Sequence, residues 1–278
     1  MSVDFRNQAL KWLAEYKLTV LGVHENGIWL RNRREYAHIL PVKLRSLNIL
    51  PDVRDEFWKW FRRPSSGHVS LHTDFHHLNS SQALCFNLFW PILSSRQLLS
   101  ILLPALEISG CPDHSGAAFE FQPNRSEGTN FDFMLPLKSG ERVYFEIKYS
   151  ESRFASAKMD EKHIVKFNSV YSSLIQNKFE ERYSGSANFL KNYQILRNIW
   201  HLRSGDYCIF LFPAANRHLL RSEKIIEACS VEPFKSHVKI VYTENLIKTI
   251  LLKTDSDADR ELFKKLWFKY FAFVSASP

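Results

Sequence analysis

Three residues in the middle of the chain, Asp132, Glu146 and Lys148, have side chains whose types and spacing could do chemistry. Two carboxylates can hold a divalent cation such as Mg²⁺, which prefers oxygen ligands and usually takes one or two carboxylates. A cation at this position would polarise a phosphodiester and lower the pKa of a water molecule. A neighbouring lysine could orient that water or offset the negative charge that grows on the phosphate. The three residues therefore predict phosphodiester hydrolysis.

The residues around them predict a β-hairpin that brings the two carboxylates together. Apolar and polar residues alternate over 131–135 and again over 143–149, which is typical of strands. In the first run we expect Phe131, Phe133 and Leu135 on one face and Asp132 and Met134 on the other. A polar turn with proline and glycine separates the two runs. If the hairpin is symmetric about Ser139, Asp132 lies directly opposite Glu146. Like charges in such a pair repel each other, so we expect a cation to lie between them.

Asp132, followed on the next strand by Glu146-Ile147-Lys148, resembles the PD-(D/E)xK signature of nucleases with restriction-endonuclease-like folds. Phe131 stands where the name of the signature has proline. Three longer stretches resemble a branch of that superfamily described as bacterial restriction endonucleases: residues 79–89 (NSSQALCFNLF), 146–151 (EIKYSE) and 193–198 (YQILRN). The resemblance covers about residues 70 to 273.

This resemblance implies an α/β (α+β) fold, with a mixed central β-sheet flanked by helices, and a metal-dependent nuclease that acts on DNA. It implies that Asp132, Glu146 and the backbone carbonyl of Ile147 bind Mg²⁺ or Mn²⁺, that Lys148 positions the nucleophilic water and that Gln194 assists. Restriction or defence against phage is the role it suggests, with DNA repair as the alternative. Cutting of both strands with one site per chain would favour a homodimer.

Two other functions remain open. The chain could be a nucleic-acid-binding or assembly module of the same fold that needs a partner for activity. It could also be an unrelated α/β enzyme in which the hairpin is an ordinary exposed ribbon, although the sequence has no Gly-rich phosphate loop and no G-x-S-x-G motif. Metal binding that is lost when Asp132 is changed would distinguish the nuclease from a pure binding module.

A third carboxylate could complete the site. Glu120 is the first candidate, because the alternating segment 117–122 could form the strand before the hairpin. Glu127 and Glu107 are rivals, and an exposed acid without a role is the alternative for each of them.

Basic residues offer candidate contacts to DNA. Lys158, Lys162 and Lys166 recur every fourth residue in a helix expected over 156–167, where they would form a stripe along phosphates or an ordinary solvated face. Arg197 is a further candidate.

Gln194, Arg197 and Asn198 fall on or near one polar side of a helix expected over 187–202 and can converge on one point. A polar face without a role is the alternative there. Arg31, Arg33 and Arg34 form another cluster, which we interpret as a solvated patch, with contact to a DNA backbone as the alternative.

The composition is compatible with these interpretations. Lys and Arg number 37 against 29 Asp and Glu, giving a net charge of +8, which suits a phosphate binder but is not specific to one. The four cysteines lack C-x-x-C spacing, and we interpret them as reduced core thiols. No signal-like N-terminus and no apolar run near the ~20 residues of a membrane span is visible, so we expect a cytoplasmic protein.

The remaining patterns predict a mainly helical N-terminal extension over 1–68 and a nuclease-like domain over 69–278. His68, His72, His76 and His77 form a small cluster. His72 and His76 have the i, i+4 spacing that could clamp zinc on a helix, but we interpret these residues as surface histidines. The other expected elements are helices over 4–17, 50–61, 81–93, 97–108, 217–229, 244–252 and 259–273, strands over 207–213 and 238–242, and a strand pair within 22–30 turned at Asn26-Gly27.

Overall fold

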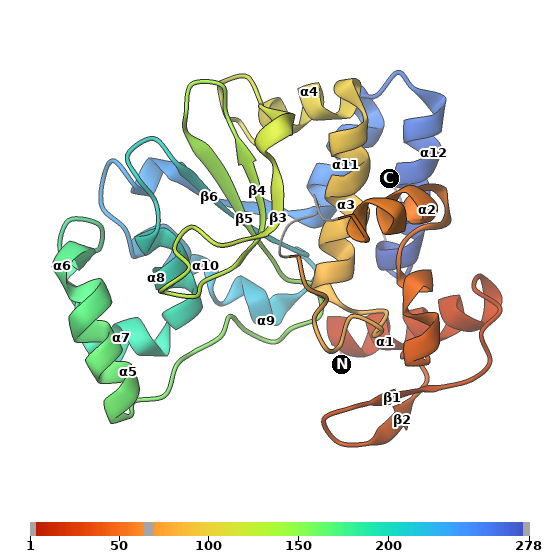
Figure 1. Cartoon of the computed structure of the whole chain (residues 1–278), viewed down its shortest axis with the longest axis horizontal. Helices are drawn as coiled ribbons and strands as arrows, with labels where there is room; N and C mark the ends of the chain where they lie inside the picture. Colours follow the sequence, from red (N-terminus) through yellow and green to blue (C-terminus); the bar gives the residue numbers. More distant parts are fainter. Residues whose placement is uncertain (1–3, 64–68, 275–278) are drawn as a thin grey trace.

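A five-stranded mixed sheet forms the centre of the computed structural model, in which residues 4–63 and 69–274 are described (Figure 1). The first three strands in the order pair antiparallel and the last three pair parallel. Helices cover the sheet, which confirms the expected fold class. The strands, in their order across the sheet, are β3 (Ala118–Phe121), β4 (Phe131–Pro136), β5 (Arg142–Ile147), β6 (Tyr207–Phe212) and β7 (Val238–Tyr242).

The hairpin of β4 and β5 has the expected register. Phe133 pairs with Phe145 and Pro136 with Arg142, so the hairpin is symmetric about Ser139. The turn uses Gly140 in the left-handed region, with φ of +102°, which glycine adopts without steric cost.

Two hydrophobic clusters cover the two sides of this hairpin. Phe133 and Phe145 belong to the first, where the Phe89 ring stacks on Phe133 with centroids 4.3 Å apart. Phe131 and Tyr144 belong to the second, so the expectation that Phe131 and Phe133 share one face is wrong. The chain can bury both faces because helices pack on each of them, as is usual for sheets with parallel strands.

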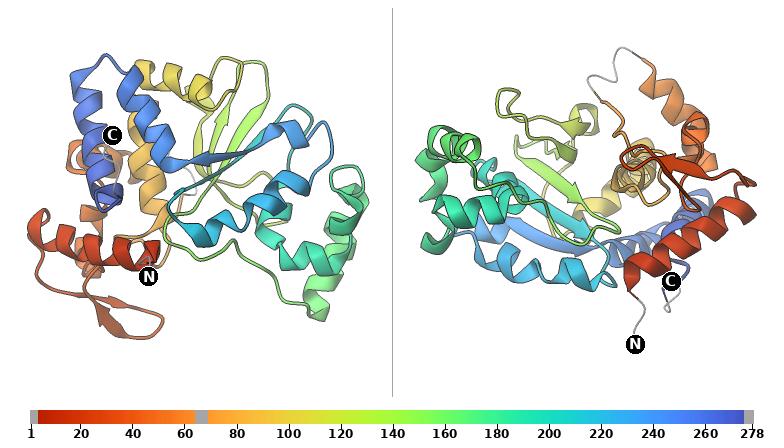
Figure 2. Two further views of the ribbon diagram at one scale, coloured as in Figure 1. Left: turned by 180° about the vertical axis from the view of Figure 1, so that it is seen from behind. Right: turned by 90° about the horizontal axis from the view of Figure 1, so that it is seen from below.

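The helices form two groups that pack with the two clusters (Figures 1 and 2). The group that packs with the first cluster is α1 (Phe5–Thr19), α2 (Pro51–Phe61), α3 (Ser81–Ser94), α4 (Arg96–Ala105), α11 (Thr243–Lys253) and α12 (Asp257–Phe271). The group that packs with the second is α5 (Glu161–Lys166), α6 (Ser172–Ile175), α7 (Ser186–Lys191), α8 (Tyr193–Trp200), α9 (Arg217–Leu220) and α10 (Glu223–Ala228). Short 3₁₀ turns are η1 (Val42–Asn48), η3 (His114–Gly116), η5 (Glu181–Tyr183) and η6 (Lys235–His237), and η4 (Phe167–Tyr171) is a π-helical turn.

The N-terminal elements pack on the same cluster as the sheet. The indole Nε1–H of Trp12 on α1 donates to the carbonyls of Phe268 and Lys269 near the end of α12, both at 3.0 Å. Phe5 on α1 lies in the first cluster with Phe133. The expected boundary at residue 68 lies outside the described residues, and the division into two domains stays a prediction.

Several expected elements differ from the structure. The helix expected over 156–167 begins at Glu161, because the side chain of Asp160 caps it by accepting from the His163 N–H at 3.1 Å. Lys158 therefore precedes the helix, and the three-lysine stripe does not form. The helix expected over 187–202 is broken at Asn192 into α7 and α8, and the one over 217–229 is α9 followed by α10.

The expected turn at Asn26-Gly27 is also wrong. Gly27 begins the strand β1 (Gly27–Trp29), which pairs antiparallel with β2 (Arg34–Tyr36) through a turn at 30–33. A Cβ at Gly27 would lie only 2.2 Å from the carbonyl oxygen of Leu40, so a close backbone contact requires this glycine. Among the described residues no single helix is long and apolar enough to cross a membrane, and α3 with α4, bent by 118°, passes that test only as a pair.

Three cysteines are buried free thiols, as expected, whereas Cys111 is exposed, so its interpretation as a core thiol is wrong. It precedes η3 in a surface connection.

A buried polar network fixes the loop that leads into β4. The side chain of Glu127 is 1% exposed and accepts from the Thr129 N–H at 2.9 Å, from the Tyr171 hydroxyl and from Lys166 Nζ at 3.0 Å. His201 Nε2 lies 3.0 Å from Glu127 Oε2, the same oxygen that accepts from Thr129, whereas Tyr171 and Lys166 donate to Oε1. Burial acts to raise the pKa of Glu127, but the bonds from these neighbours outweigh it and hold the pKa well below its ordinary value of 4.5.

This network predicts a pH-dependent loss of stability in Glu127→Gln. At pH 7 the folded state contains the ionised carboxylate with its partners, so we expect the variant to lose about 3 kcal/mol of unfolding free energy in urea. Because folding lowers the pKa of Glu127, the ionised carboxylate contributes to the unfolding free energy above about pH 4.5, and this contribution is lost as the pH falls. The difference in unfolding free energy between the wild-type protein and Glu127→Gln should therefore narrow in acid. Glu15→Gln, at an exposed position on α1, is the control and should change stability by about 0.5 kcal/mol or less. Equal stability of the Glu127→Gln and wild-type proteins at pH 7 would contradict this prediction.

Candidate active site

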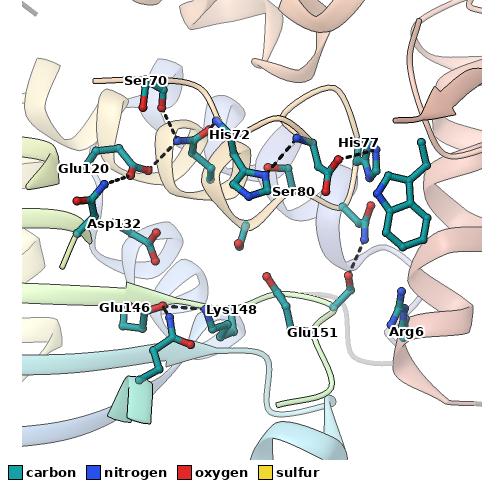
Figure 3. Close-up of a pocket in the computed structure, with 18 residues that line it drawn as sticks. Arg6, Ser70, His72, His77, Ser80, Glu120, Asp132, Glu146, Lys148 and Glu151 are labelled. Atoms are coloured by element: carbon teal, nitrogen blue, oxygen red, sulfur yellow. Dashed lines mark hydrogen bonds and ion pairs between the residues drawn. The ribbon is translucent and has the colours of Figure 1, made fainter. Parts of the chain in front are cut away.

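Three acidic residues from three neighbouring strands line one pocket of about 580 Å³ (Figure 3). Glu120 comes from β3, Asp132 from β4 and Glu146 from β5. The residues next to these acids are paired across the sheet: Phe119 with Phe133, and Phe133 with Phe145. This register places the three acids opposite one another. The structure therefore brings Asp132 and Glu146 together with Glu120, the first candidate for a third carboxylate.

The backbone is distorted where this row of acids crosses the sheet. Glu120 has φ of +51°, which is uncommon for a residue with a side chain. The ladder between β3 and β4 skips Glu120 and Asp132 and resumes with Phe121 opposite Phe131. Such local strain is concentrated at functional sites in proteins.

Glu146 is held on both carboxylate oxygens. Its Oε1 accepts from Lys148 Nζ at 2.8 Å and from Gln194 Nε2 at 2.6 Å, and its Oε2 accepts from Asn198 Nδ2 at 2.8 Å. Gln194 and Asn198 are four residues apart on α8, so they project from the same face of the helix. The Glu146 side chain is 3% exposed, and these donors fix its orientation.

Asp132 has fewer partners. Its Oδ2 accepts from the backbone N–H of Ile147 at 2.6 Å, just past the point where the β4–β5 ladder ends. The N–H and carbonyl of one strand residue point to the same side, so the Ile147 carbonyl is also directed toward β4. Burial raises the pKa of Asp132 well above its ordinary 3.8, and the nearby Glu146 and Glu120 raise it further while Lys148 opposes them.

Glu120 is supported by amides from two segments. Gln82 Nε2 on α3 donates to its Oε1 at 2.7 Å, and Asn130 Nδ2 donates to its Oε2 at 3.3 Å. Burial raises the pKa of Glu120, and these two hydrogen bonds partly offset that effect. Its rivals lie elsewhere, because Glu127 belongs to the network with His201 and Glu107 is an exposed partner of Lys239.

Lys148 carries the positive charge of the pocket. Its side chain is 12% exposed, and burial acts to lower its pKa. The carboxylates of Glu146, Glu151 and Asp132 outweigh burial and raise the pKa above its ordinary value of 10.5. Lys148 is therefore an ammonium ion at neutral pH and can donate hydrogen bonds but cannot accept a proton.

The candidate DNA contacts do not gather at this pocket. The guanidinium of Arg197 lies over the Tyr193 ring, 5.0 Å from its centroid, and Lys166 is bound to Glu127. Lys158 and Lys162 are exposed, and neither lines the pocket.

Several residues that support the site are not among the site residues predicted from the sequence. They come from the three stretches that carry the resemblance, which converge here: Asn79 Nδ2 on the first donates to the Ser150 hydroxyl on the second at 2.8 Å. Gln82 and Asn198 come from the first and third stretches. Their position within the stretches that carry the resemblance was the signal in the sequence that could have identified them as site residues.

The histidine cluster does not form the zinc site considered above. Residues 72–77 are not helical, and His76 and His77 are buried, so the interpretation as surface histidines is wrong for these two. His68 lies outside the described residues. Among the residues that the structure describes, no group of three or more His, Cys, Asp or Glu side chains is arranged to hold one metal ion.

Comparison with known protein families gives a match over most of the chain. A family model described as "Restriction Endonuclease associating with ARP" matches residues 9–271. The match spans all three carboxylates, Lys148 and α8, together with most of the N-terminal elements. No curated protein and no solved structure matches the chain.

The crowding of acids predicts that Asp132→Asn stabilises the protein in the absence of divalent metal. An amide keeps an oxygen for the Ile147 N–H and removes the charge that faces Glu146 and Glu120, so we expect a gain of roughly 1 kcal/mol. The measurement is thermal unfolding in EDTA at pH 7. Asp55→Asn, at an exposed position on α2, is the control and should leave the melting temperature nearly unchanged. A lower melting temperature for Asp132→Asn would contradict the inferred repulsion.

Proposed function

The chain belongs to the family of restriction endonucleases associating with ARP, and we propose that it is a metal-dependent nuclease of the PD-(D/E)xK type that hydrolyses phosphodiester bonds of DNA. The observation that carries this proposal is the row of three carboxylates from neighbouring strands with the Lys148 ammonium beside it. A role in restriction of foreign DNA follows from the family.

The donor set suits Mg²⁺ or Mn²⁺. Asp132, Glu146 and the Ile147 carbonyl are hard oxygen ligands, and one or two carboxylates with substrate oxygens are what Mg²⁺ usually takes. The raised pKa of Asp132 indicates that its negative charge lacks enough compensation, which a divalent cation would supply. Bound there, the cation would polarise the phosphodiester and stabilise the charge that develops on it.

The side chains of the pocket have separate roles in this proposal. Lys148, as an ammonium, donates hydrogen bonds to the attacking water or to a non-bridging phosphate oxygen. Gln194 and Asn198 keep Glu146 in one orientation. Glu120 has a raised pKa, which suits a group that takes up a proton from the attacking water.

Lys148→Ala is expected to abolish cleavage while leaving the fold intact. The fold should survive because Gln194 and Asn198 still bind Glu146. Cleavage should be lost because the Lys148 ammonium no longer stabilises the negative charge that develops on the phosphate. Removal of one such group costs about 10²-fold or more in rate. The assay is cleavage of plasmid, linear and single-stranded DNA with Mg²⁺ or Mn²⁺, and circular dichroism checks the fold.

Lys253→Ala is the matched control, because Lys253 is exposed at the end of α11, does not line the pocket and is not a candidate DNA contact. This variant should cut DNA at the wild-type rate. Cutting by Lys148→Ala at that same rate would overturn the proposed mechanism. Binding of DNA by the wild-type protein without any cutting would favour a binding module that needs a partner.

A further inference from the structure

The β1–β2 hairpin projects from the body of the protein (Figure 1). Its turn is tight, since the Arg33 N–H donates to the Trp29 carbonyl at 2.8 Å. Asn32 braces it from both sides, accepting from the Arg34 N–H at 3.1 Å and donating to the Tyr36 hydroxyl at 2.7 Å. The hairpin is therefore an ordered ribbon whose tip points into solvent.

The tip of this ribbon is strongly basic. Arg31, Arg33 and Arg34 are all exposed, and within the described part of the chain none of them forms an ion pair. Glu35 is the one acidic residue between Gly27 and Tyr36. Three guanidinium groups on a four-residue stretch thus remain available for an external anion.

The base of the ribbon, in contrast, is fixed to the body. The Gly27 N–H donates to the Ile39 carbonyl at 2.8 Å, and the backbone there is too close to Leu40 for any side chain at position 27. His76 Nε2 lies 3.0 Å from the Ile28 carbonyl oxygen. The arginines are consequently carried on a rigid support, which reduces the entropy lost when they bind a ligand.

The ribbon also joins the candidate active site. Trp29 on β1 lines the same pocket as the three carboxylates, and its ring contacts His77 edge to face with centroids 6.2 Å apart. His77 and Arg6 lie at the end of the pocket away from Glu120 (Figure 3). The ribbon therefore leaves the body at that end, beyond the position where a scissile phosphate would lie.

We propose that the β1–β2 hairpin is a DNA-contacting arm whose three arginines bind the phosphate backbone of the duplex next to the cleavage site. A two-stranded β-ribbon fits the major groove of a duplex, and guanidinium groups match phosphate oxygens in geometry and charge. This inference rests on the proposed action on DNA, and it assigns contact with the DNA backbone to an arm that starts at the candidate active site.

The salt dependence of DNA binding tests the arm. Each phosphate contact contributes about 0.9 to the slope of log affinity against log salt concentration, so replacing three contacting arginines should reduce that slope by up to about 2.7. The variant is Arg31→Gln with Arg33→Gln and Arg34→Gln, and the ligand is a duplex oligonucleotide in EDTA, where the proposed nuclease does not cut. A second variant with lysine at all three positions should retain most of the slope.

The control removes the same charge from the far side of the molecule. Arg96, Lys138 and Lys253 are exposed on α4, in the β4–β5 turn and at the end of α11, and their joint change to Gln should leave the slope unchanged. Equal slopes for the wild-type protein and the arm variant would refute the arm while leaving the proposed function intact. Failure of the wild-type protein to bind any duplex would refute both.

Discussion

The carboxylates of Glu120, Asp132 and Glu146 repel one another, and the surrounding fold must compensate this repulsion. The strand register places these acids side by side, and the low-dielectric surroundings make their charges costly. Glu146 is compensated by a lysine and two amides, and Glu120 by two amides. Asp132 receives a backbone N–H and faces both neighbours, so the uncompensated charge concentrates there. That is the position where a cation gains most.

The surrounding fold keeps these acids together against their repulsion. Apolar side chains cover both faces of the sheet, and a one-residue shift of a strand would move its side chains from one cluster to the other and disrupt the packing of both. The Glu127 network fixes the loop before β4. The side-chain amides of Gln194 and Asn198 project from one face of α8 and bind Glu146. The N-terminal elements complete the pocket through Arg6 and Trp29, so the segment expected as an extension contributes to the site.

The local parts of the fold were predictable from the sequence, and the long-range parts were not. Period-two alternation and a symmetric turn give the register of β4 and β5, because both depend on neighbours in sequence. The start of α5 depended on the capping by Asp160, which the lysine spacing obscured. Gln82 and Asn198 carry no charge pattern, and only the packing of α3 and α8 beside the sheet brings their amides to the acids.

The proposed site of the catalytic metal consists of Asp132 on β4, Glu146 on β5 and the Ile147 carbonyl. The most direct measurement is anomalous diffraction from a crystal of the protein soaked in Mn²⁺. We expect one strong peak within about 2.0–2.6 Å of carboxylate oxygens of Asp132 and Glu146 and of the Ile147 carbonyl oxygen. A fully soaked crystal with no peak at these oxygens, or with its strongest peak at the histidines of 72–77, would contradict it.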